Sequence, residues 1–266
     1  PYLADQRIGF TQLTWDKTIG KHSLLTGTAL RYNYYDDNTP ATLNANGNAN
    51  QPDEVLIPSI FVQDEIAFNK KHSLLLGGRY DYDSRHGNIF TPRGAYRFKF
   101  TDNGTFVSLD ASVFYTNFQN VIIPDYDTNP NQIIYDNLNG TSISKGVSAN
   151  VDVSFYNGLK FMLGGTIQNV SNTEDGVKER QILTESYSAN WSVGYDIRTW
   201  NLNIDYTGNL YGPMRLPTLG ESDPRSDFSP VWSIQNIQFT YDGIKNFEFY
   251  GGVKNLLDWT PNRGNP

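Results

Sequence analysis

Apolar and polar residues alternate along most of the chain with a period of two. Segment 107–116 carries apolar residues at Val107, Leu109, Ala111, Val113 and Tyr115. The positions between them are polar except Phe114, and segments 147–155 and 187–196 repeat the alternation. Successive side chains of a β-strand point to opposite faces, so each of these segments has one apolar and one polar face. The pattern predicts an all-β protein with about twelve antiparallel strands.

Turn chemistry divides the connections between these strands into two kinds. Short polar turns are predicted at 17–21, 69–72, 101–104, 157–158, 198–199 and 242–246, where Gly, Asn and Asp provide the backbone angles of tight hairpins. Longer links are predicted at 35–55, 84–88, 123–137, 171–180 and 212–230. Short and long connections alternate strictly, which is typical of an up-and-down barrel with turns on one side and loops on the other.

Composition favours a barrel in a membrane over a soluble sheet. Hydrophobic residues make up 38% of the 266 residues and the mean hydropathy is −0.51, so no segment approaches the roughly 20 apolar residues of a spanning helix. Aromatic residues reach 14% and cluster at strand ends, where rings lie at a membrane–water interface. Apolar and polar residues also alternate in soluble antiparallel sheets, so a soluble carbohydrate-binding module is the alternative interpretation. In hydrocarbon the strands must close into a ring.

Charge and cysteine content narrow the function further. The formal net charge of −7 and the isoelectric point near 4.9 argue against a nucleic-acid partner. The absence of cysteine fits passage through an oxidising periplasm. The three histidines show no arrangement with a nucleophile and an orienting carboxylate, so the sequence predicts no enzyme.

Four motifs in order resemble the barrel of TonB-dependent outer-membrane receptors, especially those of Bacteroidetes-like bacteria. They are Phe61 to Glu65, Leu76 to Asp81, His86 to Arg93 and Gly251 to Asp258. The resemblance covers most of the chain and implies an antiparallel transmembrane β-barrel of 22 strands in the bacterial outer membrane, of which residues 1–266 supply one part. Departures from the family pattern suggest that one hairpin near 106/107, the last strand, and the N-terminal plug with its TonB-contacting segment are missing.

The resemblance implies active import of a scarce nutrient such as a ferric siderophore, haem or cobalamin. The expected partners are outer-membrane lipid and TonB, reached through the missing N-terminal region, and a surface lipoprotein is a further partner that the resemblance allows. The chain itself needs no resident cofactor, since the metal chelate is cargo. A passive porin, or a structural barrel within a larger outer-membrane complex, is the alternative from another class. A plug and a TonB box in the residues that precede this chain in the full-length gene would favour the receptor over the porin or structural barrel.

Candidate ligand-binding residues lie in or beside the predicted outer connections. They are Arg85, His86, Tyr126, Tyr135, Arg180, Tyr211 and Arg215. The arginines can hold an anionic chelate through charge-assisted hydrogen bonds, and the tyrosines can stack on a planar ligand. Loop arginines also commonly pair with neighbouring acids such as Glu179, and tyrosine is abundant throughout the chain, so the loops as a set are a better prediction than any one residue.

A weak calcium motif falls in the predicted link 123–137. Asp125, Asp127 and Asn129 have the spacing that places oxygen ligands around Ca²⁺. Pro130 replaces the glycine that such a loop requires and no glutamate follows at the bidentate position, so a solvated acidic loop is the stronger interpretation.

Charged residues on the polar faces of the strands predict an aqueous interior. They are Asp81, Arg97, Asp110, Asp152 and Asp205. In the family that resembles this chain, such charges pair with the plug or with water, whereas in a porin they set ion selectivity.

Overall fold

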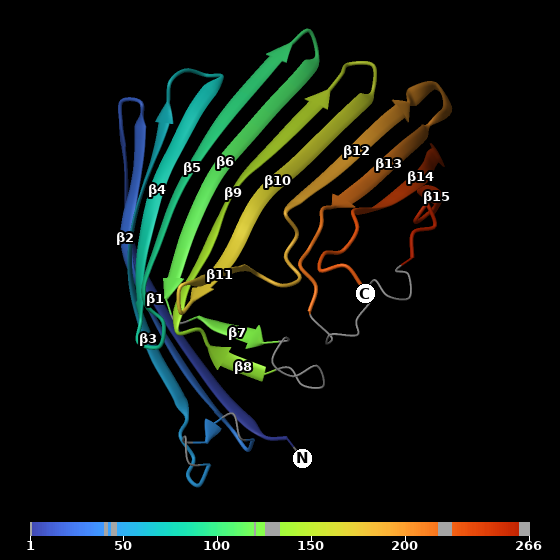
Figure 1. Cartoon of the computed structure of the whole chain (residues 1–266). Helices are drawn as coiled ribbons and strands as arrows, with labels where there is room; N and C mark the ends of the chain where they lie inside the picture. The colour runs from blue at the N-terminus through green and yellow to red at the C-terminus, as the bar shows by residue number, and fades with distance from the viewer. Residues whose placement is uncertain are drawn as a thin grey trace.

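The protein is a curved antiparallel sheet, shown in Figure 1 as a wall of tilted strands. The computed structural model describes residues 2–39, 42–43, 47–119, 121–125, 134–217 and 225–260. The elements are β1 (Ala4–Ile19), β2 (His22–Asp37), β3 (Asp53–Ala67), β4 (His72–Asp83), β5 (Gly87–Asp102), β6 (Thr105–Gln119), β7 (Ile122–Asp125), β8 (Ile134–Asn137), β9 (Gly140–Ser154), β10 (Leu159–Glu174), β11 (Val177–Arg180), β12 (Tyr187–Ile197), η2 (Arg198–Trp200), β13 (Leu202–Tyr211), β14 (Trp232–Ile244) and β15 (Phe247–Val253).

Twelve of these strands form one continuous path, as the alternation predicts. The order is β1-β2-β3-β4-β5-β6-β9-β10-β12-β13-β14-β15, with β11 added to the end of β10 and β7 paired only with β8. Every neighbouring pair is antiparallel, and nearly all contacts between elements join neighbouring strands. Within the described residues, no helix has the length and apolar content needed to span a membrane. The predicted all-β fold is confirmed.

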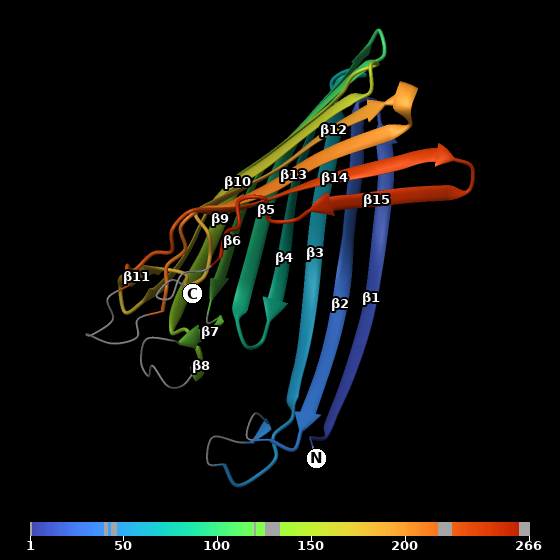
Figure 2. The same cartoon turned by 90° about the vertical axis from the view of Figure 1, so that its right-hand side faces the viewer.

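The sheet is a single layer (Figure 2). Its hydrophobic core is correspondingly small. Among the described apolar side chains, only those of Ala29, Val55, Leu138 and Leu216 are buried. Outward apolar side chains such as those of Val147 and Ile167 are 51% and 71% exposed. A soluble protein of this size covers such a face with a second layer, so the exposed apolar face requires lipid.

The two faces of the sheet are distinguished by crowding as well as by polarity. Ser59, Ser108 and Ser142 are buried although no second layer covers them. Side chains converge on the concave side of a curved sheet, so this polar side is the inner face. Cross-strand pairing places Asp81 opposite Ser59, and Asp152 opposite Ser108, on the same side. The inward direction predicted for these carboxylates is therefore confirmed by the register.

The described sheet is open along two edges. β1 pairs only with β2, and β15 pairs only with β14. In hydrocarbon an unpaired row of backbone N–H and C=O groups costs several kcal/mol per group. Both edges therefore need strand partners, and the sheet is one part of a larger closed barrel.

Connections at the two ends of the sheet differ much as predicted, with three corrections. The turn at Asn103 and Gly104 has φ angles of 47° and 78°, which is the type I′ geometry of a two-residue hairpin. At the other end, the predicted link 171–180 is itself a hairpin of β10 and β11, and link 123–137 contains β7 and β8. The connection at 84–88 is a tight turn between Asp83 and Gly87.

Candidate functional site

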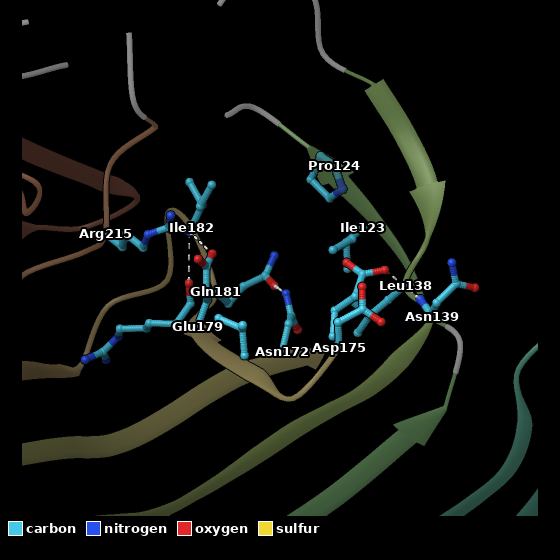
Figure 3. A pocket seen from close by; sticks show the side chains of 13 residues that line it. Ile123, Pro124, Leu138, Asn139, Asn172, Asp175, Glu179, Gln181, Ile182 and Arg215 are labelled. Atoms are coloured by element: carbon cyan, nitrogen blue, oxygen red, sulfur yellow. Dashed lines mark hydrogen bonds and ion pairs between the residues drawn. The ribbon is translucent and has the colours of Figure 1, made fainter. Parts of the chain in front are cut away.

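The long-connection end of the sheet carries a pocket between two hairpins. One hairpin is the extension of β10 into β11, which turns at Asp175 and Gly176 with φ angles of 50° and 80°. Aspartate followed by glycine accepts two successive positive φ angles, so the sequence specifies this turn directly. The other hairpin is β7–β8, followed by Leu138, whose side chain is buried. The pocket between them has a volume of about 480 Å³ (Figure 3).

One wall of this mouth pocket is fixed by backbone contacts. The backbone N–H of Asn139 donates to Glu174 Oε1 at 3.0 Å, and that of Leu138 donates to the Val121 carbonyl at 2.9 Å. At Gly140 a Cβ atom would lie 1.9 Å from the Thr173 carbonyl oxygen, so the close approach of β9 to β10 requires glycine here. The wall is therefore rigidly attached to the barrel sheet.

Arg180, the last residue of β11, lines the pocket and has side-chain nitrogens that lack a described hydrogen-bond partner. Its Nε and Nη2 atoms are buried and have no hydrogen-bond partner within the described residues. Asn172 Oδ1 is in the same condition, although Asn172 Nδ2 donates to Gln181 Oε1 at 2.6 Å (Figure 3). Leaving buried charged donors unpaired is costly. Arg180 therefore combines a place in the pocket lining with two buried donors that lack a described acceptor.

Arg215 supports Arg180 from the neighbouring connection. Its Nη1 atom lies 3.2 Å from Glu179 Oε2 and donates to the Arg180 carbonyl oxygen at 3.5 Å. The Leu183 N–H in turn donates to the Arg215 carbonyl oxygen at 2.9 Å. Because Glu179 compensates the charge of Arg215, this side chain holds the backbone of the pocket in place rather than offering an open positive charge.

A stack of three aromatic rings lies at the same end of the sheet. The Tyr211 and Trp232 rings are 4.0 Å apart between centroids, and the Trp232 and Trp259 rings are 4.6 Å apart, both nearly parallel. Tyr211 and Trp232 are direct cross-strand partners on the inner face of β13 and β14. Offset ring stacks form rigid, flat apolar surfaces. This aromatic stack (Tyr211, Trp232 and Trp259) can support a planar ligand at the inner side of the mouth.

The sequence matches a protein-family model over nearly its whole length. The family described as TonB dependent receptor-like, beta-barrel matches residues 2–106 and 103–256. The chain belongs to this family. Its members are receptors of the bacterial outer membrane rather than enzymes, so the apolar face of the sheet contacts outer-membrane lipid. A search of curated protein sequences gives no match.

Solved receptor structures share the fold of the chain. The ferric enterobactin receptor of Pseudomonas aeruginosa, in complex with enterobactin, is similar with a TM-score of 0.63 at 15% identity, over 99% of this chain and 50% of that receptor. The siderophore receptor PirA of Acinetobacter baumannii gives 0.60 at 14%, over 97% and 51%. The copper transporter OprC gives 0.72 at 16%, over 97% and 43%. The chain thus spans about half the length of these receptors.

Membership of the family orients the sheet. In outer-membrane barrels the short turns face the periplasm and the longer connections face outward. The mouth pocket and the aromatic stack therefore open on the outer side, where ligands arrive. The end with the turns at Gly20, Asn103 and Gly158 faces the periplasm.

The predicted site residues near 85 are already bound to acids of the same face. Arg85 Nη1 lies 2.7 Å from Asp53 Oδ2, and its Nη2 lies 3.2 Å from Asp83 Oδ2. The hydrogen bond that Arg85 donates to the Asp83 carboxylate raises the pKa of Arg85. His86 follows in the same turn, where its N–H donates to the Asp83 carbonyl oxygen at 3.2 Å. The structure thus places Arg85 and His86 apart from the mouth pocket, and Arg180 and Arg215 in it.

Several predicted residues lie outside the described part of the chain. Tyr126, Asp127 and Asn129 fall there entirely, while only the backbone of Asp125 and Tyr135 is described, in β7 and β8. The calcium motif thus remains a prediction. Over the described ranges, no group of His, Asp and Glu side chains is arranged to hold a metal ion.

Sequence reasoning missed three residues of this end of the barrel. Asn172 lies in a segment rich in small polar residues, Trp232 follows a long link, and Trp259 lies beyond β15. The Asp175-Gly176 pair is a signal that could have located the β10–β11 hairpin, and with it Asn172 and Arg180. The stacking of Trp232 on Trp259 has no local sequence signal, because the two residues are far apart along the chain.

Proposed function

We propose that this chain is part of the wall of a TonB-dependent receptor that imports an anionic metal chelate, with a ferric siderophore as the leading cargo. The observation that carries the proposal is Arg180, which lines a pocket at the outer mouth and whose buried Nε and Nη2 atoms have no described hydrogen-bond partner. Guanidinium groups bind carboxylate, phenolate and hydroxamate oxygens through directed, charge-assisted hydrogen bonds. The nearby aromatic stack suits a chelate with planar rings.

The structural relatives support a metal-bearing cargo. Two of those described above are receptors for ferric enterobactin or another siderophore, and a third transports copper. Haem and cobalamin, both also large and partly planar, are the other cargoes to be separated by experiment. Movement of cargo through the lumen is proposed to depend on TonB and the proton gradient of the inner membrane, as in the receptor family.

Growth of a deletion strain tests the cargo class. The gene is deleted, and the strain is grown with ferric siderophore, haem or cobalamin as the only limiting nutrient. We expect a growth defect on ferric siderophores that is restored by the wild-type gene and that is also produced by loss of TonB. A defect that is independent of TonB would favour a passive pore, and normal growth on all three nutrients would refute the import proposal.

A matched pair of arginine variants tests the pocket itself. In the intact receptor, Arg180→Gln removes a guanidinium whose Nε and Nη2 atoms have no described partner. Arg85→Gln removes an outer arginine that Asp53 and Asp83 already hold. Loss of a charged hydrogen bond costs about 1.5–3 kcal/mol, so we expect about 10-fold or greater loss of affinity for the ferric chelate in R180Q. Titration of tryptophan fluorescence measures it. Unchanged affinity in R180Q would remove the pocket from the proposal.

A further inference from the structure

Positive charge gathers on the short-turn rim of β1 to β4. The basic rim consists of Lys17, Lys21, His22, Lys70, Lys71 and His72. It holds four of the ten lysines and two of the three histidines of a chain whose net charge is −7, whereas Lys99 of β5 lies on the inner face opposite Ser108. This concentration against the overall charge separates the basic rim from the rest of the surface.

Backbone hydrogen bonds hold the basic turns side by side. The Ala67 N–H donates to the Lys21 carbonyl oxygen at 2.8 Å, which joins the β1–β2 turn to the end of β3. The Lys99 N–H donates to the Lys71 carbonyl oxygen at 2.8 Å, which joins the β3–β4 turn to β5. In Figure 1 these turns lie along one stretch of the upper rim. The charges are therefore neighbours in space.

The charges of the basic rim are open to solvent. Lys17, Lys21, Lys70 and Lys71 are exposed, and in the described part of the chain none of them forms an ion pair. The acidic side chains on the adjoining strands are Asp16, Asp64, Glu65 and Asp102. Asp64 is engaged by His22, whose Nδ1 lies 2.6 Å from Asp64 Oδ2. The lysines remain available to an anionic partner.

The rim is continuous with the lipid-facing surface through aromatic rings. Lys71 Nζ lies 4.3 Å from the centroid of the Phe100 ring. The His72 ring lies 4.9 Å from that of Phe98, and His72 Nδ1 lies 2.5 Å from the Tyr96 hydroxyl. Cross-strand pairing places these rings on the outer, apolar face. A lysine held above an interfacial aromatic ring, as Lys71 is, lies at the depth of lipid phosphate groups.

We propose that the basic rim is a binding site for the phosphate groups of anionic phospholipids in the periplasmic leaflet of the outer membrane. A lipid is favoured over a soluble anion because exposed Ile19 and Phe68 lie directly beside the lysines and can contact acyl chains. The rest of the short-turn rim differs, since its basic residues occur singly, as Lys99 in β5, Lys160 in β10, Arg198 in η2 and Lys245 in the β14–β15 turn. The site rests on the orientation of the barrel and not on the proposed cargo.

Lipid enrichment in nanodiscs provides the test. The intact receptor is reconstituted in discs of phosphatidylethanolamine with about 20% phosphatidylglycerol, and native mass spectrometry counts the lipids that remain bound after release. A basic residue near an anionic surface contributes roughly 1 kcal/mol, or about fivefold in lipid affinity. We expect enrichment of phosphatidylglycerol in the wild type, and its loss in the triple variant Lys21→Gln, Lys70→Gln and Lys71→Gln.

Two matched variants separate a site from a general charge effect. Exposed Lys160, Lys178 and Lys245 lie outside the basic rim, so their triple change to Gln alters net charge equally and should leave the enrichment unchanged. Changing Lys21, Lys70 and Lys71 to Arg should preserve it. Glycerol phosphate added at the same concentration should not displace the lipid. Equal loss in both Gln triples, displacement by glycerol phosphate, or no enrichment in the wild type would each overturn the proposal, the last pointing to an acidic protein partner instead.

Discussion

Polar side chains on the inner face of the sheet are paired by different groups in two parts of the sheet. On β3 to β6, which we term the charged half, arginine and aspartate pair directly. Arg79 Nη2 lies 2.8 Å from Asp81 Oδ1, and Arg97 Nε lies 2.6 Å from Asp110 Oδ1. On β9 to β14, the amide half, hydroxyl and amide groups replace these pairs, as in the 2.9 Å hydrogen bond between Ser148 and Thr166.

The difference determines in which part of the lumen the carboxylates already have partners within the sheet. The charged half pairs Asp81 and Asp110 with its own arginines, so these carboxylates can face water or a neutral partner without change. In the amide half, Asp152 has no ion pair or hydrogen bond within the described residues, and Asp205 is met only by Asn203 Nδ2 at 2.6 Å. The amide half therefore has more capacity to accept donors from whatever fills the lumen.

The largest effect is expected at the seam between the two halves. The Phe114 ring of β6 lies over Gly146 of β9, where a Cβ atom would lie 2.5 Å from the ring and 2.6 Å from the Ile167 carbonyl oxygen. Gly146→Ala therefore forces backbone and ring apart, at a cost of about 2 kcal/mol. The midpoint of thermal unfolding of the intact receptor, followed by the gel mobility of the folded barrel, should fall by several degrees.

Gly165 provides the control for this substitution. It lies on the neighbouring strand β10, and a Cβ atom there would be 3.7 Å from the Ser188 carbonyl oxygen, which is ordinary contact. Gly165→Ala should leave the midpoint unchanged or raise it slightly. If the two alanine variants melt alike, Phe114 does not hold the halves together.

The second expected effect is a larger loss of stability when an ion-paired residue of the charged half is changed than when an unpaired carboxylate of the amide half is changed. Arg79→Ala leaves Asp81 and Ser59 without the guanidinium that donates to both. Because the Arg79 side chain is 43% exposed, solvent screening reduces the loss to about 1 kcal/mol. Asp152→Asn in the amide half removes a charge that has no described partner and should change stability by less than about 0.5 kcal/mol. Equal thermal shifts in the two variants would abolish the distinction.

The sequence predicts the sheet far better than the mouth. Period-two alternation depends only on neighbouring residues, so segments such as 107–116 reveal both strand and face. The direction of Asp81 and Asp152 follows from the same parity. The alternation did not predict β7, β8 and β11 within the long links, because these strands are only four residues long and pair with few neighbours.

Whether a predicted arginine belongs to the binding site depends on its ion pairs with residues that are distant in the sequence. Arg85, Arg180 and Arg215 look alike in sequence, as arginines in or beside outer connections. Only the folded chain shows that Arg85 pairs with Asp53 at the start of β3, while the buried Nε and Nη2 atoms of Arg180 have no described partner. Glu179 was foreseen as a partner for a loop arginine, and it pairs with Arg215. Such distinctions depend on register between loops, which local pattern does not encode.

Acid is expected to loosen the outer end of the charged half before the amide half. Asp83 is buried, which by itself raises its pKa, but hydrogen bonds from the Arg85 side chain and backbone outweigh burial and lower it overall. A depressed carboxyl pKa stabilises the fold above the ordinary value near 3.8, and that contribution is lost as pH falls below it. The protection factors of residues 83–87, which are corrected for the intrinsic pH dependence of exchange, should therefore fall below about pH 4, and Asp83→Asn should remove this fall.

The smallest expected effect concerns salt. Arg97 and Asp110 are 52% and 37% exposed, so their attraction is screened as ionic strength rises, and such pairs contribute less than about 1 kcal/mol. The hydroxyl bond between Ser148 and Thr166 carries no net charge and should not respond. Between roughly 0.05 and 1 M NaCl, amide exchange should increase slightly around Arg97 and Asp110, and stay constant around Thr166. The same increase at both places would mean that salt acts on the barrel as a whole, because only charge pairing distinguishes these two cross-strand contacts.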